Sequence, residues 1–106
     1  MIGLTVNKTK QEALIKVIVA TLPADIKVNI FPKDADNGCT VHFKNEYGAS
    51  IITNGLGEED GLYELAVLNS ESIDYTTPIT SDVIGYRTKS DIVEILVQIN
   101  KLQPRD

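Results

Sequence analysis

Apolar residues recur at the spacing of an α-helix in only two stretches, one near each end of this chain. Between these stretches, apolar and polar residues alternate as they do in β-strands. Because strands and helices do not alternate, the pattern does not predict a parallel sheet built from strand–helix–strand units. The sequence instead predicts an α+β fold: an antiparallel sheet of four or five strands, with an N-terminal and a C-terminal helix packed on one face.

Local signals give the expected boundaries of these elements. Thr9 and Glu12 have the spacing of a capping box, which predicts a helix over 9–21, with Lys10, Gln11 and Lys16 off its apolar face. Thr88 and Asp91 repeat that spacing before a helix that runs to about residue 102. The expected strands cover 26–30, 39–44, 49–53, 62–68 and 73–75. A hairpin turn is expected at 45–48, where Gly48 is able to take a positive φ, and a short helical turn over 82–84.

Length and composition limit the kind of protein. The chain has 106 residues, of which 42% are hydrophobic and 24% charged, and this predicts one globular domain over 1–106. Cys39 is the only cysteine, so no internal disulfide is expected. No leader peptide is evident, and no apolar stretch approaches the ~20 residues of a membrane span. We therefore expect a cytoplasmic protein without membrane association.

The formal net charge of −5 bears on the choice of partner. An acidic surface repels the phosphate backbone, whose neutralisation by Lys and Arg supplies most non-specific affinity for nucleic acids. Direct binding to nucleic acid is therefore not expected. The same charge favours either simple solubility or contact with a basic protein partner.

No constellation of residues predicts catalysis or a cofactor. His42 is the only histidine, and Cys39 three residues before it points to the opposite side of the same expected strand. Asp34 and Asp36 resemble the opening of a calcium loop, but the spacing of the following residues breaks the ligand pattern. The sequence therefore predicts a protein that is not an enzyme and that holds no metal or cofactor.

Two groups of residues are candidates for contact with a partner. Glu58, Glu59 and Asp60 occupy the tip of the glycine-rich loop 54–61, which is expected to be flexible and is either a solvated loop or an electrostatic contact for a basic protein. Tyr63, Tyr75 and Tyr86 are expected to cluster, and a groove between them is an alternative site for a small ligand. The candidate partner-binding residues are Glu58, Glu59, Asp60, Tyr63, Glu64 and Tyr75.

A third possibility follows from the strand expected over 62–68. Its second half, through Leu65, Ala66, Val67 and Leu68, is apolar on both faces. If both helices cover one face of the sheet, the other face is expected to expose apolar side chains. Such a patch often marks an interface, so a homodimeric structural or accessory domain is an alternative function.

Three segments also carry a family resemblance. They are 47–50 (YGAS), 61–68 (GLYELAVL) and 77–86 (TPITSDVIGY), the last followed by an acidic and apolar helix. In this pattern the chain resembles, over residues 45–102, a group of small proteins encoded by tailed bacteriophages and prophages. The resemblance implies a phage protein that acts in the host cytoplasm by binding and inhibiting or modulating a host protein. A CRISPR effector or another nucleic-acid-handling complex is the implied kind of target, in the anti-CRISPR manner.

Overall fold

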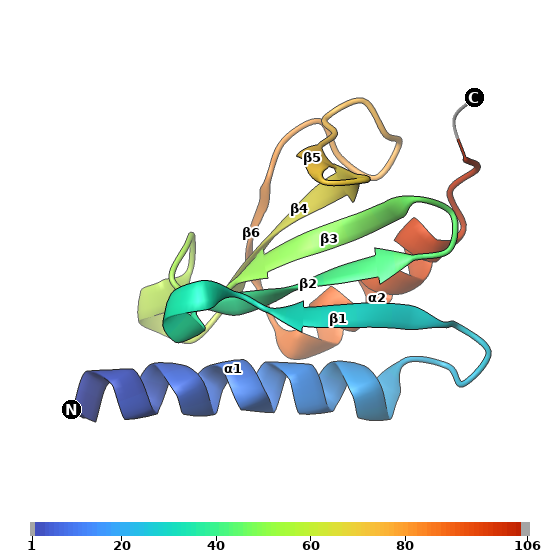
Figure 1. The fold of residues 1–106 in the computed structure, drawn as a ribbon. Coiled ribbons are helices and arrows are strands. Elements are labelled where there is room, and N and C mark those ends of the chain that lie inside the picture. The colour runs from blue at the N-terminus through green and yellow to red at the C-terminus, as the bar shows by residue number, and fades with distance from the viewer. Residues whose placement is uncertain (1, 105–106) are drawn as a thin grey trace.

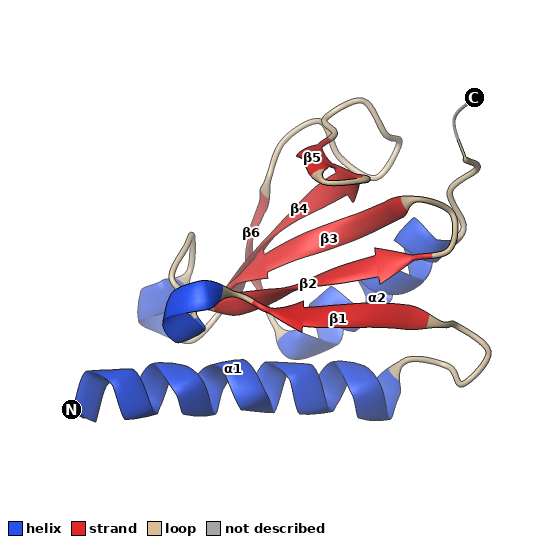
Figure 2. Cartoon of the chain, in the orientation of Figure 1, coloured by secondary structure: helices blue, strands red, loops and turns tan. Residues whose placement is uncertain are grey.

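The computed structural model describes the backbone of residues 2–104 and the side chains of residues 9–104. Its two helices lie at the ends of the chain and its strands between them (Figure 1, Figure 2). In order, the elements are α1 (Ile2–Thr21), β1 (Val28–Pro32), the 3-10 turn η1 (Asp34–Asp36), β2 (Gly38–Phe43), β3 (Tyr47–Ile52), the 3-10 turn η2 (Glu58–Asp60), β4 (Tyr63–Asn69), β5 (Ser72–Ile73), β6 (Ile84–Arg87) and α2 (Lys89–Asn100). The predicted α+β class is confirmed.

All strand pairs of the sheet are antiparallel. The strands β1, β2, β3 and β4 follow one another as neighbours, as expected for a meander. The short strands β5 and β6 share the far edge of β4: Ile73 pairs with Leu68 near its end, and Arg87 with Tyr63 at its start. The prediction of a helical turn over 82–84 was wrong, because this segment leads directly into β6, which pairs with a strand about twenty residues earlier.

The core lies between the sheet and the two helices. Both helices send apolar side chains to the same face of the sheet, as predicted, and the fully buried ones are Leu14 and Ile18 from α1 and Ile92, Leu96 and Ile99 from α2. Alternate residues of the central strands meet them, namely Cys39, Val41, Ala49, Ile51, Leu65 and Val67. The helices therefore form one layer and the sheet the other.

The opposite face of β4 does not carry the apolar patch expected from the sequence. Ala66 and Leu68 point away from the helix layer, yet they are only 7% and 5% exposed. Ile52, on the same face of β3, is half-buried. The strand is therefore covered on both faces, and the proposed reason for a homodimer through this face is removed.

The first helix begins before the expected boundary. It extends from Ile2 to Thr21, so the Thr9–Glu12 pair lies inside the helix and does not start it. Gln11, expected on the polar side, is only 5% exposed. Its Nε2 donates to the carbonyl oxygens of Lys33 (3.0 Å) and Gly38 (2.7 Å). This side chain therefore fastens α1 to the turn between β1 and β2.

The second helix begins as predicted. The Thr88 hydroxyl accepts from the Asp91 amide (3.1 Å), and the Asp91 carboxylate accepts from the Thr88 amide (3.0 Å), which completes a capping box. These hydrogen bonds from Thr88, helped by nearby Arg87, hold the pKa of Asp91 below its usual value. At the other end, Asn45 donates to the carbonyl oxygens of Ile99 (2.9 Å) and Leu102 (3.0 Å).

The hairpin between β2 and β3 places its unusual backbone conformation two residues earlier than expected. Glu46, not Gly48, has the positive φ, at 74°. A three-residue loop with its last residue in the left-handed region is a common hairpin connection. Gly48 is needed for a different reason, because a Cβ there would lie 2.3 Å from the Val41 carbonyl oxygen.

Candidate protein-binding site

The loop that joins β3 to β4 is held in place by hydrogen bonds, although its sequence predicted flexibility. The Tyr86 amide in β6 donates to the Leu56 carbonyl oxygen (3.1 Å), and the Leu62 amide donates to that of Gly57 (2.9 Å). The Glu64 carboxylate accepts from the Leu56 amide (3.1 Å). These three bonds tie the loop to both β6 and β4.

Two glycines let the loop lie against β6. Gly57 has a φ of 99°, and a Cβ there would lie 2.9 Å from the Leu62 Cβ and 3.0 Å from the Tyr86 Cα. A Cβ on Gly85 would lie 2.6 Å from the Leu56 Cβ. Real side chains cannot approach so closely, so glycine is required at both positions for this contact.

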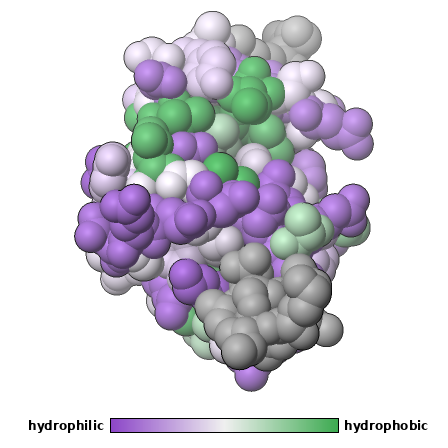
Figure 3. Space-filling model, turned by 90° about the vertical axis from the view of Figure 1, so that its left-hand side faces the viewer, coloured by the Kyte–Doolittle hydropathy of each residue, from purple (hydrophilic) through white to green (hydrophobic). Residues whose placement is uncertain are grey.

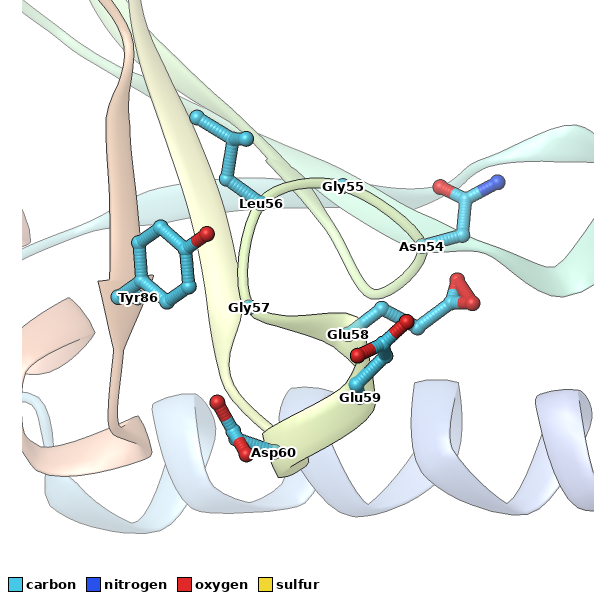
Figure 4. Close-up of a pocket in the computed structure, with 8 residues that line it drawn as sticks. All are labelled: Asn54, Gly55, Leu56, Gly57, Glu58, Glu59, Asp60 and Tyr86. Atoms are coloured by element: carbon cyan, nitrogen blue, oxygen red, sulfur yellow. The ribbon is translucent and has the colours of Figure 1, made fainter.

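The loop and β6 surround an open depression of about 390 Å³. Its lining residues are Asn54, Gly55, Leu56, Gly57, Glu58, Glu59, Asp60 and Tyr86. In Figure 4, Tyr86 stands on one side of the loop and the side chains of Asn54, Glu58 and Glu59 on the other. The site therefore combines carboxylates from η2 with an aromatic ring from β6.

Two large side chains in this depression are exposed. Leu56 is 47% exposed and Tyr86 is 60% exposed, while the three acidic residues of η2 are exposed beside them. Figure 3, which views the molecule from the left-hand side of Figure 1, shows hydrophobic side chains next to a band of hydrophilic ones. Aromatic side chains are enriched at protein interfaces, and the rim of an interface is polar and solvent-accessible.

The backbone of Tyr86 is also unusual. Its φ is 56°, in the left-handed region that a bulky side chain seldom adopts. Such a conformation costs about 1–2 kcal/mol for a residue other than glycine. The ring is mostly exposed, so burial of its surface offsets little of this cost.

The structure separates the residues that the sequence predicted as contacts. Glu58, Glu59 and Asp60 do lie together on η2. The Glu64 carboxylate contributes by accepting a hydrogen bond from the Leu56 amide in the same loop. Tyr63 is only 6% exposed, and burial raises the pKa of its phenol. Its selection as a contact residue was therefore wrong, because the folded chain offers almost none of its surface.

The predicted tyrosine cluster does not form. Tyr75 is 46% exposed, but it follows β5, which pairs with the last residues of β4. Tyr86 lies near the first residues of β4 and Tyr63 is buried, so the three rings do not line one groove. The suggested tyrosine groove for a small ligand has no counterpart among the described side chains.

Sequence reasoning missed the contribution of Leu56 and underrated that of Tyr86. The two residues are thirty positions apart in the sequence, and their proximity depends on the pairing of β6 with β4, which leaves no local signal. One signal was available: Leu56 is a large apolar residue between two glycines in an otherwise polar loop. Such a residue indicates either a contact with the body of the protein or an exposed anchor.

His42 and Cys39 lie on opposite faces of β2. Cys39 is fully buried in the core, and that burial raises the pKa of its thiol to about 12 despite the opposing effect of Lys33. The thiol is therefore protonated at neutral pH. The His42 ring packs edge-on against Phe31 on the face away from the helices, with 5.8 Å between ring centres.

Within residues 9–104, no three or more His, Cys, Asp or Glu side chains are grouped so that they could hold a metal ion. Neither of the helices described has the length and apolar character needed to cross a bilayer.

Comparison of this chain with protein-family models, with curated proteins and with solved structures finds no match in any of the three.

Proposed function

We propose that this chain is a non-enzymatic interaction protein that binds a basic partner protein through the loop 54–61 and Tyr86. One observation carries the proposal: the carboxylates of η2 and the exposed side chains of Leu56 and Tyr86 line one depression. The apolar groups supply contact area, and the carboxylates favour lysine or arginine side chains on the partner.

The charge distribution supports the choice of partner. Residues 45–104 carry ten acidic and three basic side chains, whereas residues 9–44 carry four acidic and five basic ones. The negative charge therefore belongs to the part of the chain that holds the loop. Complementary charge steers a basic partner to this surface and raises its association rate.

The resemblance to phage and prophage proteins gives this proposal its more specific form. In it, the chain is phage-encoded, acts in the host cytoplasm, and inhibits or modulates a host protein that handles nucleic acid, such as a CRISPR effector. The acidic loop would compete with the nucleic acid for a cationic groove on that protein.

The test is affinity capture from nuclease-treated bacterial lysate, using the tagged chain and two variants of equal net charge. The first variant, E58K/E59K/D60K, reverses the charge of η2. The matched control, E12K/E71K/E94K, reverses three exposed carboxylates elsewhere on the surface. We expect one dominant basic protein, identified by mass spectrometry, with the wild type and the control, and its loss with the η2 variant.

Two results would contradict the proposal. Equal loss of capture with both triple variants would mean that net charge, not this surface, attracts the partner. A turnover measured with the purified chain and abolished by His42→Ala would instead establish an enzyme.

A further inference from the structure

A second surface lies at the other end of the sheet, where β1 has no neighbour beyond it among the described strands (Figure 1). The Lys33 amide donates to the Gly38 carbonyl oxygen, and the β1 register then makes Asn29 and Phe31 the residues that bond to β2. Because hydrogen-bonding direction alternates along an antiparallel strand, Val28 and Ile30 direct their N–H and C=O groups away from the sheet.

The same edge borders an apolar groove. A space of about 440 Å³ separates the C-terminal half of α1 from β1, and its lining includes Ile18, Val19, Leu22, Val28 and Ile30. Val19 is 66% exposed at this groove, and Phe31 is 55% exposed on the other face of β1. An edge strand with free backbone groups and exposed apolar neighbours is a template for another strand.

We propose that β1 pairs with β1 of a second copy of this chain, antiparallel and around a twofold axis at Asn29. In this register Val28 of each copy lies opposite Ile30 of the other. Both residues point their backbone groups outward, so the pair of strands forms four hydrogen bonds. The Val28 and Ile30 side chains of both copies then lie on the helix side, beside the apolar groove.

The charges at the ends of β1 favour this register over its neighbour. With the axis at Asn29, Lys27 lies opposite the exposed ring of Phe31 of the second copy. A shift that centres the axis on Ile30 would instead place Lys27 opposite Lys33. Opposite charges across two strands stabilise the pair and like charges destabilise it.

Pro32 limits how far the pairing extends. It is the last residue of β1 and, like Val28 and Ile30, occupies a position whose backbone groups point away from the sheet. Proline, however, has no N–H to donate. The donors of Val28 and Ile30 are therefore the last in this strand. The twofold pairing uses the β1 edge of both copies, so it gives a closed dimer and not a growing chain of strands. Among the side chains that the structure describes, none from β1 or α1 lines the acidic depression, so both copies keep theirs accessible and the dimer is bivalent.

The experiment combines sedimentation with cysteine cross-linking in the full chain. Sedimentation equilibrium from micromolar to millimolar concentration should show a reversible shift from 11.6 kDa to twice that mass. Asn29→Asp places two carboxylates against each other at the axis, and we expect it to weaken the dimer about tenfold. Asn29 is exposed, so this variant should keep its fold, which circular dichroism checks.

Cross-linking tests the register. Asn29→Cys brings two thiols to a Cα separation of about 4.5 Å, within the range of a disulfide, so oxidation should yield a covalent dimer. The matched control Phe31→Cys faces Lys27 of the second copy and should remain monomeric on a denaturing gel. A monomer at every concentration, or equal cross-linking by both variants, would overturn the proposal.

Discussion

The two loops that carry a 3-10 turn offer the most informative comparison in this molecule. Both contain acidic residues, Asp34 and Asp36 in η1 and Glu58 to Asp60 in η2, and both contain residues with positive φ. They differ in what holds them. The buried side chain of Gln11 in α1 donates two hydrogen bonds to the turn 33–38. The loop 54–61 is bonded instead to Glu64 of β4, and the side chains of Leu56 and of the η2 residues stay exposed.

The turn 33–38 joins parts of the fold, whereas the loop 54–61 exposes its side chains to solvent. We call the first the structural loop and the second the presenting loop. At 33–38, Gln11 and the buried Gly38 join the helix layer to the sheet, and Lys33 offsets part of the acidic charge. At 54–61, the side chain of Leu56 and three carboxylates are exposed to solvent. Acidic residues on a tight turn therefore do not by themselves indicate a site, and their exposed apolar neighbours distinguish the two cases.

The largest effect is expected at the structural loop. In Gly38→Ala the new Cβ would lie 1.9 Å from the Ile51 carbonyl oxygen, at a φ of 146°. Backbone strain and overpacking together should lower the free energy of unfolding by at least ~3 kcal/mol. Urea denaturation measures this, and a loss below ~1 kcal/mol would mean that the turn is not fixed.

A pair of glycine variants tests the presenting loop. Gly57→Ala adds a clash with Leu62 to the cost of a positive φ, whereas Gly61→Ala at φ 70° meets no atom within 4 Å. We expect losses of ~2–3 kcal/mol for Gly57→Ala and ~1–2 kcal/mol for Gly61→Ala. Equal losses in urea denaturation would contradict the close contact between the loop and β6.

The next effect is expected at the helix that fastens the first loop. Gln11→Met keeps the volume of the side chain but removes both of its hydrogen bonds. The Lys33 carbonyl oxygen loses this donor, whereas that of Gly38 still accepts from the Lys33 amide. An unsatisfied buried group costs ~1–3 kcal/mol, and we expect a loss of about 2 kcal/mol in the same denaturation assay. Lys10→Met, one residue away and exposed, is the control and should change stability by less than ~0.5 kcal/mol.

The smallest change in stability is expected at Tyr86. Asparagine tolerates the left-handed conformation better than tyrosine, so Tyr86→Asn should leave stability unchanged or raise it by up to ~1 kcal/mol. Partner capture from lysate should nevertheless fall, because the exposed ring is lost. A loss of more than ~1 kcal/mol in stability would show that the ring serves the fold.

The parts of the fold that could be predicted are those with local causes. The cap of α2 was predictable because Thr88 and Asp91 satisfy each other within one turn, and the central strands because their apolar residues alternate. The start of α1 was not, because Thr9 and Glu12 have capping spacing inside a helix that simply continues. Strand β6 was missed because its pairing with β4 is not local, and Gly85 looked like a break.

The candidate site was predictable only in part. The acidic residues of η2 are adjacent in sequence and were selected as a group. Leu56 and Tyr86 meet only through the pairing of β6 with β4, and Tyr63 is buried because it belongs to the core between the sheet and the helices. A contact surface that tertiary structure assembles from distant segments has no local sequence pattern that would predict it.

The central claim is that the loop 54–61 is a fixed surface, and amide hydrogen exchange of the native chain tests it most directly. The Tyr86 and Leu62 amides donate to Leu56 and Gly57, as the Thr53 amide donates to Asn37 at the structural loop. We predict that Tyr86 and Leu62 exchange as slowly as Thr53, within about tenfold. Exchange of both amides at the rate of an unstructured peptide, with Thr53 protected, would contradict the claim.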